Sequence, residues 1–435
     1  MQTTKDSWWK TFPTLILAAA AANYRVDISD TSLLRFCGFS CSIFTSQGTL
    51  TPLHARLPSR GGIRLGQSNE EYEVKLRSDW SRQGATRGCN ATHVSMIVRY
   101  VQFLKELHAH LNTSFSQQTL QALVARKAVH NSECLQWQMS LDDFKEMDDS
   151  FNIFKCIHQV VNDEEAVYKL TYDVIHEFAE DNVKYLELRS TPKDIPSTGM
   201  TRDLYVRTML RAVHDCHLEN VDIMVYILLS IDRRNSVEIA QLTVDLAEKF
   251  YKETGVVVGL DFSGHPGIGN AADFIPVFKS AKEKGLKISC HLAELAMYEE
   301  TLAVLRQSPP DRIGHGTFLH RYDPGQGYEE IEDTVISKRI PIEACMTSNL
   351  KTNTVSKYSE HHFDFWFRKR HPVILCTDGK GVYKTSLSGE YIHAARTFSF
   401  SKQDLWQLTL GSIDHIFAPD TIKTLLHNKW QLACP

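Results

Sequence analysis

The sequence predicts an α/β protein whose main part is a (β/α)8 barrel of the TIM type with insertions, preceded by an irregular N-terminal extension. From about residue 99 onward, short apolar runs alternate with amphipathic stretches, which is typical of parallel strands joined by crossover helices. Eight such runs can be counted, and a barrel of this kind is built from eight strand–helix units. An open, doubly wound sheet is the alternative.

The expected strands are short runs rich in apolar and β-branched residues. They lie at 101–107, 183–189, 222–230, 256–262, 286–292, 311–316, 340–346 and 372–378. Between them, apolar residues recur three and four positions apart, as at 163–182 and 236–253, which predicts helices with one buried face. The largest insertion is expected between the first and second strands.

Residues 1–98 have a different character. No apolar period of 2 or 3.6 is sustained there, and turn-forming residues are frequent, as in SRGGIRLGQSNEE. We therefore expect 1–98 to be a disordered or irregular extension, and 99–435 to be a metal-dependent barrel with C-terminal helices.

The composition is that of an ordinary globular protein, with 43% hydrophobic residues, 23% charged residues and a net charge of −4. Because this charge is small, we expect neither nucleic acid nor a membrane surface as a partner. The apolar run at 14–22 is shorter than a membrane span, and the acid at position 6 argues against a signal peptide. The ten cysteines include no CxxC pair, so we expect reduced thiols. We expect the protein to be a cytoplasmic monomer.

Polar residues able to bind a metal gather at the ends of four expected strands. HAH follows the first strand, HLAE ends the fifth, GHG the sixth and TD the eighth. Active sites of such barrels lie at the C-terminal ends of the strands, so these motifs are expected to meet at one rim.

A metal site is predicted from four of these residues. His108 and His110 are two positions apart, so on a strand their imidazoles face the same side. HxH alone is a modest signal in a chain with 19 histidines, but His291 and Asp378 complete a set of three imidazoles and one carboxylate. This set suits one Zn²⁺ per chain with a position open for water, although iron or another divalent ion would also fit.

Two further residues are candidates for acid–base catalysis. A bound ion lowers the pKa of its water from about 15.7 towards 7. Glu294, three residues after His291, would be near enough to exchange a proton with that water. His315 lies between two glycines in RIGHGT and could orient the water. The alternatives are a surface glutamate and a hydrogen-bonded core histidine.

These motifs resemble the adenosine deaminase family of zinc hydrolases, from about residue 101 to the C-terminus. The segments YLELRSTP, DRIGHGTFLH, TSNLKTNTV, HHFDFW and CTDGKGVY are especially similar to its adenosine deaminase-like branch, the N6-methyl-AMP deaminases. The resemblance implies that Glu294 protonates purine N1, that His315 orients the attacking hydroxide, and that the histidine and aspartate set holds zinc. The implied reaction is hydrolysis of N6-methyl-AMP to IMP and methylamine, with adenosine deaminase as a lesser alternative.

The resemblance also implies which residues hold the purine nucleotide. They are His110, His158, Ser190, Thr191, Pro192, Lys193, Asp232 and Gly264. Hydroxyls, amides and a cation in one loop suit a 5′-monophosphate. Without the resemblance, the charged turn at 232–234 would equally be a solvated surface feature.

The chain departs from the family pattern at four positions. Thr113 replaces the glycine of LNGS, Lys193 the arginine of STPR, His265 the aspartate of SGDP, and Gly379 the second aspartate of TDD. In the family, that second aspartate resembles a hydrogen-bonding partner of purine N7, and losing such a bond costs about 1.5–3 kcal/mol. The contact at Gly379 is therefore in doubt, and an impaired or non-catalytic barrel that binds zinc and nucleotide is the alternative to an active deaminase.

Overall fold

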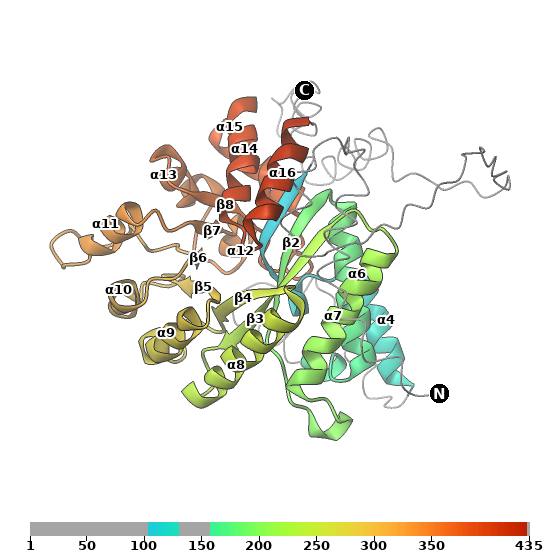
Figure 1. Ribbon diagram of the computed structural model, residues 1–435. Coiled ribbons are helices and arrows are strands. Elements are labelled where there is room, and N and C mark those ends of the chain that lie inside the picture. Colours follow the sequence, from blue (N-terminus) through green and yellow to red (C-terminus); the bar gives the residue numbers. More distant parts are fainter. Residues whose placement is uncertain (1–102, 130–156, 433–435) are drawn as a thin grey trace, which may run out of the picture. The chain divides into compact units, whose positions relative to one another are not determined.

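The computed structural model describes residues 103–129 and 157–432, and eight parallel strands form its centre (Figure 1). Each strand pairs with the next one along the chain, in the order β1 to β8. The strands are Leu104–His110 (β1), Val183–Ser190 (β2), Met224–Asp232 (β3), Val257–Ser263 (β4), Lys287–Leu292 (β5), Arg312–His315 (β6), Ile342–Ala344 (β7) and Val373–Leu375 (β8). The predicted extension at 1–98 lies outside the described residues.

The ring of strands is joined just beyond β8. Asp378 pairs in parallel with Ala109 of β1, and it exchanges backbone hydrogen bonds of 2.8 Å with His108 and His110. The predicted TIM-type barrel is therefore confirmed, and the open sheet is excluded.

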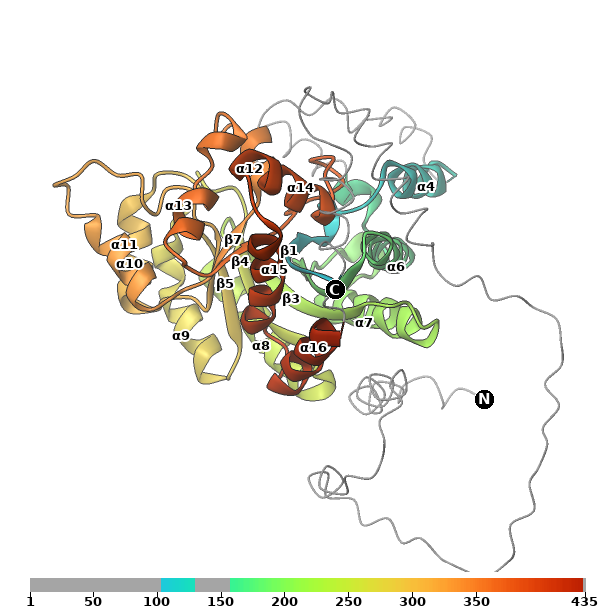
Figure 2. The same ribbon diagram turned by 90° about the horizontal axis from the view of Figure 1, so that it is seen from above.

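Most of the helices lie around the outside of the strands, as the view from above shows (Figure 2). The described α-helices are Gln117–Ala128 (α4), Glu164–Glu180 (α6), Arg202–Leu218 (α7), Val237–Thr254 (α8), Ile275–Glu283 (α9), Tyr298–Gln307 (α10), Glu329–Ser337 (α11), Met346–Lys351 (α12), Phe363–Arg368 (α13), Leu387–Phe398 (α14), Lys402–Gly411 (α15) and Asp420–Leu432 (α16). None of the described helices is long and apolar enough to cross a membrane.

Local signals set several helix ends. The Asp163 side chain accepts from the Ala166 amide at the start of α6, and Ser401 and Asp404 form a reciprocal capping box at the start of α15. Helix α8 ends at Gly255, whose φ of 65° is open to glycine at little cost.

Strand boundaries differ from the expected ones at both ends of the barrel sequence. Strand β1 starts only after Phe103, whose φ of 67° interrupts extended backbone. The strand continues to His110, so both histidines of HAH lie inside it instead of following it. Strand β7 is shorter than expected because α12 begins at Met346.

The interior of the barrel has an apolar part and a charged part. Near the N-terminal ends of β2 and β3, Tyr185 and Tyr226 pack with apolar residues of the C-terminal segment, including Trp430. Deeper in the ring, Arg189 and Arg312 are fully buried with carboxylates from neighbouring strands. This charged layer lies directly beneath the residues predicted to bind metal.

Candidate active site

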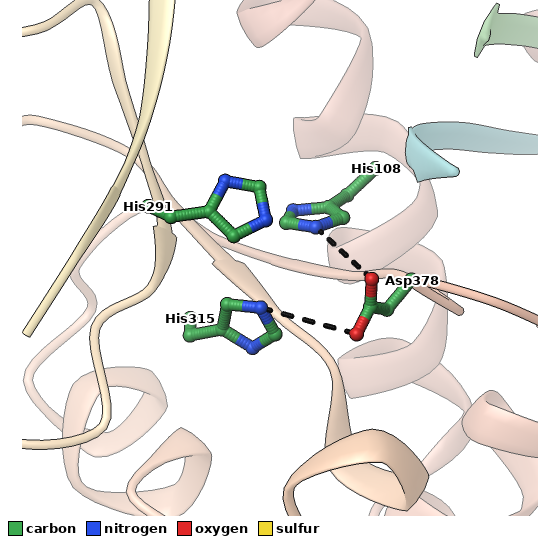
Figure 3. Close-up of side chains that lie close together, drawn as sticks. All are labelled: His108, His291, His315 and Asp378. Atoms are coloured by element: carbon green, nitrogen blue, oxygen red, sulfur yellow. Dashed lines mark ion pairs between the residues drawn. The ribbon is translucent and has the colours of Figure 1, made fainter. Parts of the chain in front are cut away.

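The predicted metal ligands lie close together where the strands end. Figure 3 shows three of them, His108, His291 and Asp378, together with His315. His110 Nε2 lies 3.2 Å from His291 Nε2 and 3.5 Å from Asp378 Oδ1, and His108 Nε2 lies 3.6 Å from the same oxygen. Two ligands each about 2.1 Å from one ion, at an angle of about 90–120°, are about 3.0–3.6 Å apart. The spacing therefore fits a single divalent ion.

One buried atom also requires a partner at this position. His108 is completely buried, and its Nε2 has no hydrogen-bond partner among the described residues. Such orphaned buried polar atoms are rare in folded proteins, and metal coordination is one way to satisfy them. The ligand set thus fits a metal both by distance and by chemistry.

His315 belongs to the same cluster. His108, His291, His315 and Asp378 each offer a ligand atom within 4.8 Å of the others. The His315 Nε2 lies 3.9 Å from Asp378 Oδ2 and 3.8 Å from Glu294 Oε1. It is therefore within reach of both the metal position and the predicted acid.

Buried carboxylates lie beside two of the imidazoles predicted to bind metal, and the sequence analysis did not identify them. Glu343 Oε2 lies 2.7 Å from His108 Nδ1, and Asp261 Oδ1 lies 3.2 Å from His291 Nδ1. Arg189 donates to both carboxylates, at 3.0 and 2.8 Å. Such partners fix the ring orientation of a metal ligand. The signal available in the sequence was a single acid inside each of two apolar strand runs, VVVGLDF and IPIEACM.

Burial shifts the proton affinity of the catalytic candidates in opposite directions. It raises the pKa of Glu294 to about 7, so a large fraction of this carboxyl is protonated at neutral pH. It lowers the pKa of His315 well below the ordinary value, so this imidazole is neutral. Burial alone would raise the pKa of Asp378, but the imidazoles of His108, His315 and His110 beside it hold the pKa low, which keeps this carboxylate ionised.

The backbone turns sharply where the site residues leave their strands. Ala293, His315 and Asp378 have φ values of 52°, 61° and 61°. Among non-glycine residues, Asp and His tolerate this left-handed conformation comparatively well, and it recurs at functional sites. The turns end the strands at the rim.

A single cavity collects most of the predicted site. Of the predicted residues, it is lined by His110, His158, Ser190, Thr191, Lys193, Asp232, Gly264, His291, Glu294, His315 and Asp378. His108, Pro192 and Gly379 are not in this lining. Residues that the sequence reasoning did not assign to the site also line it, namely Asn112, Arg189, Arg234, Ser263, Pro266, Thr352 and Tyr383.

Cationic and hydroxyl groups form the part of the cavity predicted to hold the phosphate. Burial lowers the pKa of Lys193 to about 7 and that of His158 to about 3. The Arg234 guanidinium binds the Asp232 carboxylate through contacts of 2.5 to 3.1 Å. A Cβ at Gly264 would lie 2.7 Å from Asp232 Oδ1, so this loop has no room for a larger residue.

The substituted positions lie in different surroundings. His265 accepts a hydrogen bond from the Gly267 amide of its own loop and is not in the cavity lining. Thr113 lines the cavity, whereas Gly379 lies behind the Thr113 side chain. Position 113, rather than position 379, therefore meets whatever the cavity binds.

Comparison with known proteins gives consistent matches over the barrel. The family model described as adenosine deaminase matches residues 104–431. The N6-methyl-AMP deaminase of Danio rerio is 45% identical over 326 residues, which are 75% of this chain and 93% of the fish protein. The Homo sapiens N6-methyl-AMP deaminase is 43% identical over 332 residues, 75% of this chain and 91% of that protein.

Solved structures agree with these sequence matches. The structure of the ADAL–IMP complex has a TM-score of 0.71 at 34% identity, and the match covers 78% of this chain and 98% of that one. Arabidopsis ADAL complexed with GMP has a TM-score of 0.70 at 35% identity, with the same coverage of 78% and 98%.

Proposed function

The chain belongs to the adenosine deaminase family, and on this premise we propose that it is a metal-dependent hydrolase that converts N6-methyl-AMP to IMP and methylamine. Relatives named N6-methyl-AMP deaminase, at 43% and 45% identity over most of their length, support this assignment. The observation that carries this assignment is that one cavity is lined both by donor atoms that could hold a metal and by the cationic side chains of Lys193 and Arg234.

We propose zinc, one ion per chain, held by His108, His110, His291 and Asp378. Three imidazoles and one carboxylate at the observed spacing support this choice. A divalent ion in this position supplies Lewis-acid activation of water at neutral pH.

Glu294 acts as the acid in this proposal. With its pKa raised to about 7, it carries a proton that it can give to purine N1, which makes C6 a better electrophile. Neutral His315, 3.8 Å from Glu294, accepts a hydrogen bond from the attacking water and helps to remove its proton. A C6–O bond forms, the C6–N bond breaks, and the amine leaves with the proton that His315 took from the water. N1 keeps the proton from Glu294, and Glu294 recovers one from the new C6 hydroxyl as C6 becomes a carbonyl.

The other end of the cavity suits a 5′-monophosphate. Lys193 and Arg234 provide cationic donors, and Thr191 provides a hydroxyl. His158 is neutral at pH 7 and contributes a hydrogen bond rather than a charge. We propose that this group distinguishes nucleotides from free nucleosides.

We further propose that the protein works in the cytoplasm as a monomer. The free, buried thiols of Cys216, Cys290, Cys345 and Cys376 support a reducing compartment.

The test is turnover by purified, zinc-loaded protein supplied with N6-methyl-AMP, AMP or N6-methyladenosine, with methylamine, ammonia and the 6-oxo product measured. We expect the highest kcat/KM for N6-methyl-AMP, and Glu294→Gln serves as the inactive control. A preference for the nucleoside would indicate adenosine deaminase-type activity. Binding of IMP without turnover of any substrate would indicate the non-catalytic alternative.

A further inference from the structure

Gly379 occupies a position where the structure has no room for a side chain. An ideal Cβ built there would lie 2.5 Å from Thr113 Oγ1 and 2.7 Å from Thr113 Cβ. Rotating the threonine side chain would move the hydroxyl but not Cβ, which is fixed by the backbone. The φ of Gly379 is not in the left-handed region, so space and not backbone conformation requires glycine here.

Thr113 is held firmly against this position. It ends the 3₁₀ turn Leu111–Thr113 that follows β1, and its carbonyl oxygen accepts from the amides of Gly381 and Val382 at 3.0 and 3.1 Å. A Cβ at Gly381 would overlap the carbonyl oxygen of Phe115. The loops after β1 and β8 are therefore packed against each other, and a larger residue at 379 would have to displace both.

The Thr113 side chain is the part of this pair that meets the cavity. Thr113 lines it together with His110, Glu294 and Asp378, and Gly379 does not. Its Oγ1 donates to the His110 carbonyl at 3.2 Å, which is long for a hydroxyl donor. A ligand acceptor could therefore take over this proton at little cost.

We propose that Thr113 and Gly379 form one purine-recognition unit, in which the Thr113 hydroxyl donates to purine N7 and Gly379 provides the space that Thr113 fills. The choice of N7 rests on the proposed function, which assigns Glu294 to purine N1. N3 lies on the far side of the six-membered ring from the reacting C6, so N7 is the remaining ring nitrogen near C6. In a neutral purine, N7 accepts a hydrogen bond. A hydroxyl can donate that bond, whereas an ionised carboxylate has no proton to donate.

The hydroxyl is tested by the affinity of the zinc-loaded protein for IMP and for 7-deaza-IMP, measured by calorimetry. The wild type is expected to prefer IMP by roughly three- to tenfold, the value of one neutral hydrogen bond. Thr113→Val keeps the volume but removes the donor, so it should abolish the preference. Thr113→Ser should retain it. An unchanged preference in Thr113→Val, or none in the wild type, would overturn the proposal.

The packing of the pair is tested by thermal unfolding of the wild type, Thr113→Gly, Gly379→Asp and the double variant. Gly379→Asp alone should lower Tm by about 2–10 °C, as overpacking does. The double variant should recover most of that loss. A Gly379→Asp protein as stable as the wild type, or a double variant no better than Gly379→Asp, would contradict the proposal.

These outcomes separate the inference from the proposed function. Absence of turnover with the IMP preference and the Tm coupling intact would refute the deaminase assignment alone. Absence of any IMP binding by the zinc-loaded wild type would overturn both the recognition unit and the nucleotide assignment.

Discussion

Replacing Glu343 by glutamine should weaken metal binding and destabilise the barrel, although the residue is outside the cavity lining. Its carboxylate lies 2.7 Å from His108 Nδ1, 3.0 Å from Arg189 Nη2 and 2.6 Å from Arg312 Nε. Burial alone would raise the pKa of Glu343, but the two guanidinium groups hold it well below its ordinary value. Glutamine keeps the shape and removes the charge that both arginines use.

The expected loss of stability depends on which carboxylate partners the two arginines retain in the variant. Breaking a buried ion pair costs about 3–5 kcal/mol. Arg189 retains Asp261 at 2.8 Å and Arg312 retains Glu187 at 2.5 Å, so we expect the lower end of that range. A loss of about 3 kcal/mol corresponds to a Tm decrease of roughly 6–12 °C. Loss of the partner that orients His108 should reduce metal affinity about 10- to 100-fold.

The assay is zinc competition against a chelator, combined with thermal unfolding in the presence and absence of zinc. Glu332→Gln is the matched control, because Glu332 pairs with Lys369 at the surface at 2.8 Å. That variant should change stability by less than about 1 kcal/mol. If Glu343→Gln binds zinc as tightly as the control, Glu343 does not orient the metal site. If it also unfolds at the wild-type temperature, the ion network does not stabilise the barrel.

Three further predictions concern the catalytic acid, the phosphate pocket and the N-terminal segment. Glu294→Gln should lower kcat for N6-methyl-AMP by about 10²- to 10⁴-fold without changing zinc content by elemental analysis, and retained activity would exclude Glu294 as the acid. Since the pKa of Lys193 is lowered to about 7, it is cationic below that pH and neutral above it, whereas phosphate becomes dianionic above about pH 6. IMP affinity measured against pH should therefore peak between these values, and Lys193→Arg should remove the fall at high pH. A wild type whose affinity does not fall at high pH would contradict this assignment. A chain starting at Val94 should unfold cooperatively and retain kcat/KM for N6-methyl-AMP, because the family match and the described barrel begin at 104; failure to fold would show that the barrel needs the preceding residues.

Much of the barrel could be predicted because each strand carries its own local signal. The eight apolar runs located all eight strands, with errors of a few residues at their ends. The HxH spacing predicted that His108 and His110 face one side of β1, and the structure places both near His291 and Asp378. The strand-end motifs thus carry most of the information about the predicted metal site.

The features that were missed depend on residues from distant strands. Glu343 and Asp261 meet Arg189 and the histidines predicted to bind metal only once the barrel has closed. Nothing in their local sequence distinguishes an inward-facing charged layer from an isolated acid. Likewise, Thr113 and Gly379 look like two independent substitutions until their volumes are compared in space.

The pairing of Ala109 in β1 with Asp378, which follows β8, also has a consequence for biosynthesis. Asp378 contributes its backbone to the ring and its side chain to the cluster around His108 and His110. At usual translation speeds, the ribosome needs roughly 15–50 s to add the ~270 residues that separate them. A nascent chain therefore exposes the edge of β1 and an incomplete ligand set throughout that interval. During folding, the ring can close and the predicted metal ligands can come together only after the final strand has been synthesised, and both happen in the same step.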